Sequence, residues 1–226
     1  MTEAATGHLG PLLLSVELAA LTTLLLLVFA TPVAWWLAHS RARLKPLVQA
    51  VVAMPLVLPP TVLGFYLLIL LGPYGAIGSW WVTLTGETLT FSFTGLVIAS
   101  FIYSLPFAVQ PLQAAFAQAG TRELEAARTL GAGPVDAFVS VAVPLAAPGF
   151  LAAAVLSFAH TLGEFGVVLM VGGNIPGETR VVSIAIYDHV EALDYRAAHE
   201  LAAILLLFAF AVLFAMFTVN RRWAYR

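Results

Sequence analysis

The stretch Thr121–Gly149, TRELEAARTLGAGPVDAFVSVAVPLAAPG, is a polar island between two apolar runs. Thr121 is suited to cap a helix, and Glu123 and Glu125 place negative charge in its first turns. Gly131 can adopt the left-handed conformation that ends a helix. These signals predict a helix of roughly nine residues. Helices shorter than about 12 residues are marginal in water, so we expect this one to dock on another surface.

A second helix is predicted to begin at Gly133-Pro134. Proline is well suited to the first turn, because the N–H that it lacks would have no partner there. Asp136 follows near the positive end of the predicted helix dipole. Two helices are therefore expected to enclose a short turn at Gly131.

The spacing of the island resembles the cytoplasmic loop of bacterial ABC importer permeases. That loop reads E-A-A, three residues, G, nine residues and I-x-L-P. Here Glu125-Ala126-Ala127, Gly131 and Val141-Ala142-Val143-Pro144 follow the same spacing, with Val in place of Ile and of Leu. The resemblance implies a coupling helix seated in a groove of an ATPase subunit. The residues implied to couple are Arg122, Glu123, Glu125, Ala126, Ala127, Gly131 and Pro144. The alternative is an ordinary amphipathic connector between two membrane spans.

The composition is that of an integral membrane protein. Of the 226 residues, 61% are hydrophobic and only 10% are charged. Cysteine is absent, which excludes disulfides, thiolate metal sites and a cysteine nucleophile. The chain has no G-x-x-x-x-G-K-[ST] loop, so any ATP is expected to be bound by another subunit. We expect no cofactor, metal site or nucleic-acid partner, and no enzyme activity in this chain.

Five apolar stretches are long enough to cross a bilayer, which takes about 20 residues. They cover about residues 12–37, 47–71, 93–119, 137–171 and 199–219, and the coupling loop covers 120–136. With five crossings, most cations share one side, and only Arg180 and Arg196 lie on the other. Positive residues mark the cytoplasm. We therefore predict a single multi-pass domain in a bacterial inner membrane, with the amino terminus outside and the carboxyl terminus inside.

Prolines interrupt the second stretch. Pro55, Pro59 and Pro60 remove backbone donors, so they are expected to kink or break the helix. Freed carbonyls are tolerated in a membrane only against protein or a watery cavity. Pro59 and Pro60 are therefore candidates for a pore or gate, and the alternative is a structural kink.

Two amides lie in the third stretch. Gln110 and Gln113 are three residues apart, hence on one helix face, and amides are poorly placed against lipid. Either they line a pathway or they hold helices together.

The fourth stretch is too long for one ordinary crossing. We predict one crossing followed by a segment broken near Gly163, Gly166, Gly172 and Gly173. Glu164 lies in this segment, beside Phe165, and an ionisable group inside an apolar stretch suggests function. It could anchor a gate by hydrogen bonds, pair with a helix dipole or carry a proton. The alternative is a carboxylate satisfied by backbone donors of the broken helix. Binding of an anion by Glu164 itself is not expected, because like charges repel.

Nearby, His160 is predicted to be packed or hydrogen-bonded rather than a metal ligand, because no second ligand lies at metal spacing.

Three further strings are similar to the permeases of molybdate importers. They are PLVLPP at 55–60, GEFG at 163–166 and NIPGETR at 174–180. The resemblance covers roughly residues 12–219 and implies a permease homodimer, two ATPase subunits and an oxyanion-binding protein docked outside. Arg180 is a docking candidate. It could attract an oxyanion or the docking protein, or merely pair with Glu178.

These observations predict an all-α membrane protein of about five transmembrane helices with the ABC importer permease fold. The resemblance implies transport of molybdate, with tungstate as a second substrate. A sulfate or thiosulfate permease is the first alternative, because it shares every physical feature above. A proton-coupled secondary transporter is the second, with Glu164 and His160 as a relay and no ATPase.

Overall fold

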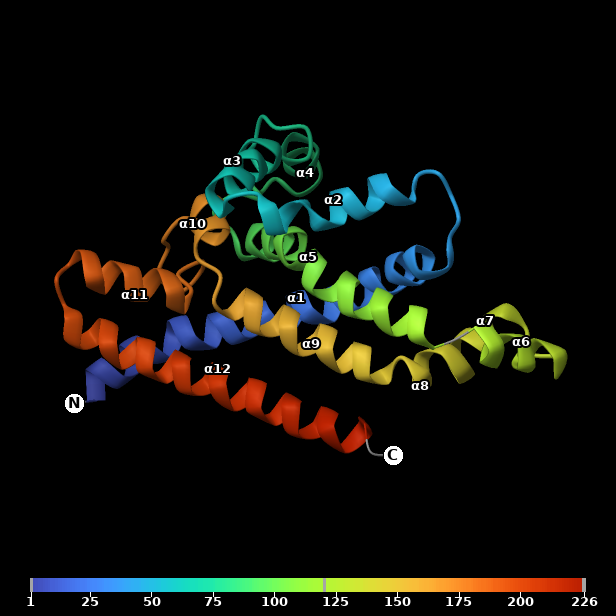
Figure 1. Ribbon diagram of the computed structural model, residues 1–226. Helices are drawn as coiled ribbons and strands as arrows, with labels where there is room; N and C mark the ends of the chain where they lie inside the picture. Colours follow the sequence, from blue (N-terminus) through green and yellow to red (C-terminus); the bar gives the residue numbers. More distant parts are fainter. Residues whose placement is uncertain (1, 120, 225–226) are drawn as a thin grey trace.

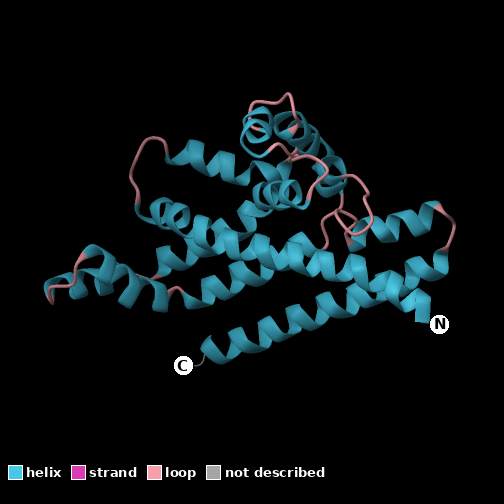
Figure 2. Ribbon diagram, turned by 180° about the vertical axis from the view of Figure 1, so that it is seen from behind, coloured by secondary structure: helices cyan, strands magenta, loops and turns pink. Residues whose placement is uncertain are grey.

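The computed structural model describes residues 2–119 and 121–224, and every regular element in those ranges is helical (Figures 1 and 2). Four long helices form the body of the molecule. They are α1 (Thr2–His39), α5 (Phe93–Gln118), α9 (Ala147–Leu162) and α12 (Tyr195–Ala224). α1, α5 and α9 pack against one another, and α12 packs against α9. This all-helical architecture confirms the predicted fold class.

Shorter elements cover the ends and one side of this body (Figure 1). They are α2 (Lys45–Val57), α3 (Pro60–Leu71), α4 (Gly78–Thr85), α6 (Thr121–Thr129), α7 (Pro134–Ala137), the π-helical turn η1 (Phe138–Ala142), α8 (Val143–Leu145), α10 (Gly166–Gly172) and α11 (Val182–Glu191). α6 and α7 project at one end, and α10 and α11 lie toward the other (Figure 1). The described chain begins near α11 and finishes at the opposite end (Figure 1).

Small side chains allow the three central helices to approach closely. Ala30 and Ala34 of α1, Ala108 of α5 and Ala153 of α9 are fully buried in one core cluster. Helices in a membrane associate by close packing, because lipid tails are as apolar as leucine side chains. The small residues therefore allow the close van der Waals packing that holds these helices together in place of the hydrophobic effect.

Three helices within the described ranges are long and apolar enough to cross a membrane: Leu9–His39, Phe93–Gln118 and Tyr195–Thr218. The count rises to five if two bent helix pairs are each taken as one span. The bent pairs fall in the second and fourth apolar stretches of the sequence.

The second apolar stretch is broken at Pro59 and Pro60 as predicted, whereas Pro55 lies inside the continuous helix α2. α2 and α3 meet at an angle of 113°. Pro59 and Pro60 stand at the break and both lack the N–H that an α-helix needs. By contrast, Pro106 and Pro111 leave α5 continuous. Two adjacent prolines thus break the chain where two separated ones do not.

The fourth apolar stretch is broken twice. The first break, at residues 163–165 between α9 and α10, confirms the interruption predicted at Gly163. The second was not predicted: Pro134–Leu145 and Ala147–Leu162 meet at 69°. Here Pro144 cannot donate to the carbonyl four residues earlier, and the preceding turn widens, so that the Val143 N–H donates to Phe138 O.

Candidate functional site

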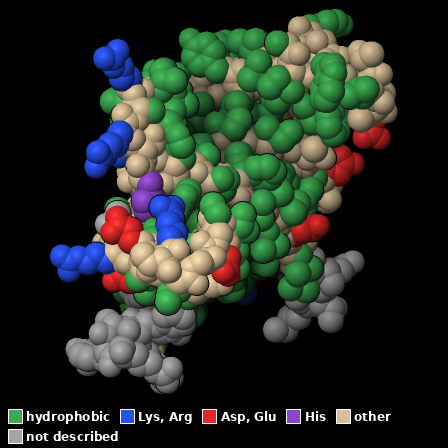
Figure 3. Space-filling view, turned by 90° about the vertical axis from the view of Figure 1, so that its right-hand side faces the viewer, with side chains coloured by type: hydrophobic (Ala, Val, Ile, Leu, Met, Phe, Trp, Pro, Cys, Tyr) green, Lys and Arg blue, Asp and Glu red, His purple; other side chains and the backbone are tan. Residues whose placement is uncertain are grey.

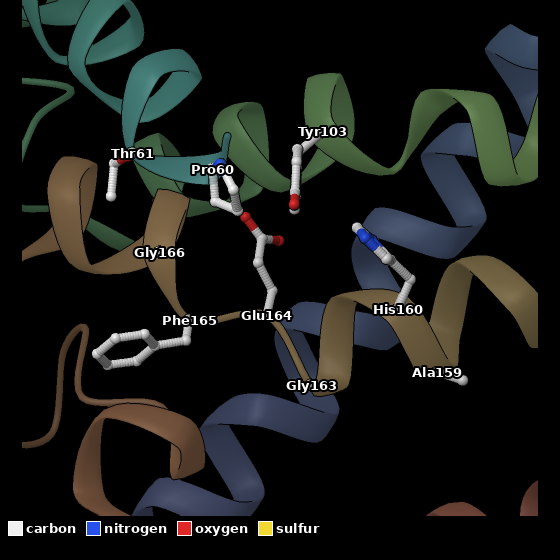
Figure 4. A pocket seen from close by; sticks show the side chains of 9 residues that line it. All are labelled: Pro60, Thr61, Tyr103, Ala159, His160, Gly163, Glu164, Phe165 and Gly166. Atoms are coloured by element: carbon white, nitrogen blue, oxygen red, sulfur yellow. The ribbon is translucent and has the colours of Figure 1, made fainter. Parts of the chain in front are cut away.

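A cavity of about 590 Å³ opens where four chain segments meet. It is lined by the start of α3, the middle of α5, the end of α9, and the break that leads into α10 (Figure 4). The lining residues are Pro60, Thr61, Tyr103, Ala159, His160, Gly163, Glu164, Phe165 and Gly166. Three of the predicted pore or gate residues, Pro60, Glu164 and Phe165, thus come together from segments about a hundred residues apart.

Close packing of α3 on α10 brings the two breaks together. A Cβ atom added to Gly166 would lie 2.7 Å from Pro60 Cβ. Likewise, one added to Gly64 would lie 2.8 Å from Met170 Cβ. Glycine is therefore required at both positions for this approach, which places the start of α3 against Glu164.

Glu164 is the ionisable residue of the cavity whose side chain is most deeply buried. Its side chain is 5% exposed and extends toward Pro60 and Tyr103 (Figure 4). Neither carboxyl oxygen has a hydrogen-bond partner among the described residues. The alternative of a carboxylate satisfied by backbone donors is therefore wrong, because the N–H groups that follow the break do not reach the carboxyl oxygens.

The backbone around Glu164 is held by a hydrogen bond and a ring contact from α11. Ser183 Oγ donates to Glu164 O at 2.5 Å, and the Phe165 ring contacts the Tyr187 ring at 5.0 Å. The Val182 N–H in turn donates to Ser15 Oγ of α1 at 2.7 Å. The main chain of the break is thus anchored on two helices, while the Glu164 carboxyl has no hydrogen-bond partner in the described part of the chain.

At the exposed end of α11, Tyr187 donates a hydrogen bond of 2.7 Å to Glu191 Oε1. This hydrogen bond to the carboxylate is the main cause of the raised pKa of the Tyr187 hydroxyl.

His160 is packed and hydrogen-bonded, as predicted. Its Nδ1 shares a hydrogen bond of 2.9 Å with Ser104 Oγ, which also lies 2.9 Å from Thr161 Oγ1. The ring stacks on Phe107 with centroids 4.0 Å apart and lies 4.8 Å from the Tyr103 ring. In the described part of the chain, no group of three His, Asp or Glu side chains is placed to hold a metal ion.

Not all predicted pore residues reach the cavity. Pro59 is exposed at the turn between α2 and α3, and Gln110 and Gln113 lie further along α5. Gln110 is exposed and Gln113 half-buried. However, Gln110 follows Tyr103 by seven residues, which is two helical turns, so both lie on one face of α5. The sequence did not predict Tyr103 or Thr61 as cavity residues. The seven-residue spacing between Tyr103 and Gln110 could have indicated Tyr103.

The predicted coupling residues lie at the far end of the molecule. α6 is anchored by Leu124, which is 5% exposed, and Ala127 is half-buried. Gly131 ends the segment with φ of 92°, the left-handed conformation expected of it. The remaining predicted coupling residues, Arg122, Glu123, Glu125, Ala126 and Pro144, are exposed. Figure 3 looks onto this end, where Lys and Arg side chains gather beside hydrophobic surface.

Arg180 lies on the other side of the molecule from this loop. Its Nε donates to Asn174 Oδ1 at 2.6 Å and lies 3.5 Å from Asp188 Oδ2. The alternative pairing with Glu178 is therefore wrong. Since Asn174 also donates to both oxygens of Asp188 at 2.7 Å, the three side chains tie the loop that precedes α11 to that helix.

Comparison with known proteins gives relatives over nearly the whole chain. The chain is 61% identical over 213 residues to the molybdenum transport system permease protein ModB of Azotobacter vinelandii, covering 94% of each chain. It is 38% identical over 179 residues to ModB of Escherichia coli strain K12, covering 79% of this chain and 78% of that one. The sulfate transport system permease protein CysT of the same strain is 33% identical over 199 residues, covering 88% and 72%.

Solved structures share the fold at low sequence identity. A bacterial ABC transporter involved in alginate import matches with a TM-score of 0.75 and 16% identity, covering 95% of this chain and 79% of that one. The MetNI methionine ABC transporter matches with a TM-score of 0.72 and 18% identity, covering 96% and 94%. The model of the family described as binding-protein-dependent transport system inner membrane component matches residues 30–225. The chain therefore belongs to this family of inner membrane permease components.

Proposed function

We propose that the chain is the permease subunit of an ATP-driven importer for molybdate, with tungstate as a second substrate. The observation that carries the proposal is the 61% identity to a molybdenum transport permease over 94% of both chains. The aligned 213 residues include both the cavity and the coupling loop. In this role the chain moves its substrate across the membrane without changing it chemically.

The exposed end of α6 and α7 is proposed to dock on an ATPase subunit. Leu130 is 89% exposed and Val135 is 76% exposed, although both are apolar. Exposed apolar side chains rimmed by charges are typical of a protein interface. Arg122, Glu123 and Glu125 supply such a rim, and their exposure leaves them accessible to a partner. Two ATPase subunits are proposed, one for each copy of the permease.

The coupling end is proposed to face the cytoplasm. The exposed cations Arg41 and Arg43 precede α2, close to the coupling end, and positive residues in short loops support an inward orientation of that end. The amino terminus, α11 and the Arg180 loop would then face outward, toward an oxyanion-binding protein. Two copies of the permease are proposed to enclose one path between them.

Sulfate is the second candidate substrate. It is supported by the 33% identity to a sulfate transport permease over 88% of this chain. Molybdate and sulfate are both tetrahedral dianions, so the same neutral donors can serve either. The higher identity to molybdenum permeases favours molybdate.

The test is uptake by the complete complex. The permease is co-purified with its ATPase, reconstituted with ATP inside vesicles, and given radioactive molybdate on its loaded binding protein. We expect uptake that stops with vanadate, persists with a protonophore, and is inhibited by unlabelled tungstate more than by sulfate. Uptake that needs the proton gradient but no ATP would instead support the secondary transporter. Stronger inhibition by sulfate than by tungstate would favour the sulfate permease.

A further inference from the structure

The cavity around Glu164 contains no cation to pair with it. None of the nine lining residues is lysine or arginine. Both carboxyl oxygens of Glu164 lack hydrogen-bond partners among the described residues, and the side chain is 5% exposed. A buried carboxyl without a partner is far more costly charged than neutral, and such groups take up a proton instead. The arrangement thus favours the neutral acid.

A neutral carboxyl changes what the cavity can bind. Its O–H is a donor, which adds to the hydroxyl groups of Tyr103 and Thr61 on the same cavity. The twelve-residue helix α3 also begins here, so the positive end of its dipole lies at Pro60 and Thr61. The N–H groups of Val62 and Leu63 already donate to Pro59 O, which leaves the Thr61 N–H as the free donor of this turn among the described residues. The site thus offers several hydrogen-bond donors that carry no formal positive charge.

We propose that this cavity is a transit site for the tetrahedral oxyanion, in which the neutral Glu164 carboxyl, Tyr103 and Thr61 donate hydrogen bonds to it. The inference rests on the proposed import of an oxyanion and deepens it by naming where the anion is held in the membrane. Neutral donors suit transit, because a path must bind its substrate well enough to admit it and weakly enough to release it. The volume of 590 Å³ leaves room for the anion together with water.

This role makes transport depend on the protonation of Glu164. Once ionised, the carboxylate loses its donor and repels the oxyanion, so uptake is expected to fall as pH rises. The other titratable groups facing the site are Tyr103 from α5 and His160 from α9, while α3 and α10 contribute none to its lining. From α11, Tyr187 contacts the Phe165 ring, and its hydroxyl donates to Glu191 at the exposed end of the helix. His160 is bound to Ser104 and stacked on Phe107, so Glu164 is the group whose ionisation opposes the anion.

The experiment compares wild type with Glu164→Gln over a range of pH in the reconstituted complex, with radioactive molybdate on its binding protein. Glutamine keeps a donor and cannot ionise. We expect Glu164→Gln to transport, and the ratio of wild-type to variant uptake to fall with rising pH, by up to about tenfold per pH unit once the ionised form dominates. Dividing the two rates removes the pH dependence of the ATPase and the binding protein. Glu87→Gln, at an exposed loop position, is the matched control and should follow wild type.

Two further variants test the donors. Tyr103→Phe and Thr61→Val should each lower uptake by about two- to tenfold, the usual value of one hydrogen bond, while the complex stays monodisperse. These variants keep the inference testable if Glu164→Gln fails to assemble.

A constant ratio across pH would overturn the inference, and so would a Glu164→Gln complex that assembles but is inactive while Glu164→Asp transports. Unaltered uptake by both donor variants would overturn it as well. These results would refute the transit site alone, because the wild-type complex would still take up molybdate. Absence of wild-type uptake at every pH would instead refute the proposed function.

Discussion

Glu164 shows how a single residue can be fixed by its backbone and free in its side chain. Its carbonyl accepts a hydrogen bond from Ser183, and its carboxyl oxygens accept none from the described residues. The carboxyl can therefore change partners or protonation without loss of an existing hydrogen bond. A residue in this situation responds to a ligand at little structural cost, which is why the transit role is assigned to it.

Gly131 gives a prediction at the same scale. Its φ of 92° is strained for any residue with a Cβ atom, by roughly 1–2 kcal/mol. Gly131→Val should therefore disturb the turn after α6 and weaken ATPase docking by roughly tenfold, measured by co-purification and by ATP-driven uptake. The permease should still reach the membrane, because Gly131 is exposed and far from the helical core.

Gly133→Ala is the matched control. Gly133 has φ of −69°, and a Cβ atom added there would meet nothing within 4 Å. Normal docking by Gly131→Val, or an equal loss in both variants, would show that the left-handed turn does not determine coupling.

At the scale of elements, the contact between α3 and α10 decides whether the cavity exists. Gly166→Ala would bring its Cβ to 2.7 Å from Pro60 Cβ, against a ring that cannot move aside. Overpacking of this kind costs about 1–3 kcal/mol. We therefore expect Gly166→Ala to lower the thermal stability of the purified permease in detergent by several degrees.

Gly163→Ala, three residues earlier in the same break, is the comparison. Its added Cβ would have only ordinary contacts, the nearest at 3.7 Å from Ala159 O, and its φ of −91° suits alanine. Its thermal stability should equal that of wild type. Equal melting of both variants would mean that the breaks of α3 and α10 can separate without cost.

For the whole molecule, the important relation is that α9 links the cavity to the coupling loop. Its sixteen residues begin at Ala147, next to the bend after α8, and end beside His160 and Glu164. This helix spans about 24 Å at 1.5 Å per residue. A movement of α6 and α7 can therefore be transmitted to the cavity by one rigid helix, which is the shear or rigid-body motion typical of packed domains.

The orientation supplies the prediction at this scale. The chain contains no cysteine, so single cysteines can be introduced as unique labels. Ala42→Cys lies in the exposed basic turn before α2, and Glu87→Cys lies in the exposed loop after α4. A membrane-impermeant maleimide applied to intact cells should label Glu87→Cys and leave Ala42→Cys unlabelled until the membrane is opened. Labelling in the reverse order would invert the proposed topology.

Much of the fold is local in origin, and the sequence by itself determined that part. Pro59 and Pro60 lack backbone donors, so a break is required wherever the rest of the chain lies. The turn at Gly131 follows equally from glycine's freedom to adopt positive φ. The apolar stretches likewise determined that the chain crosses a membrane as helices, because each is about 20 residues or longer, whereas a strand of a membrane barrel needs only about ten.

Only the tertiary structure decided which distant side chains meet. Glu164 shares its cavity with Thr61 and Tyr103, residues that no local pattern connects to it, because α3 must first pack on α10. Arg180 contacts Asp188 rather than Glu178, which is closer to it in the sequence, because the loop folds back on α11. Backbone limits act between neighbours in the chain, whereas contacts between side chains depend on how helices pack, and that is a property of the whole molecule.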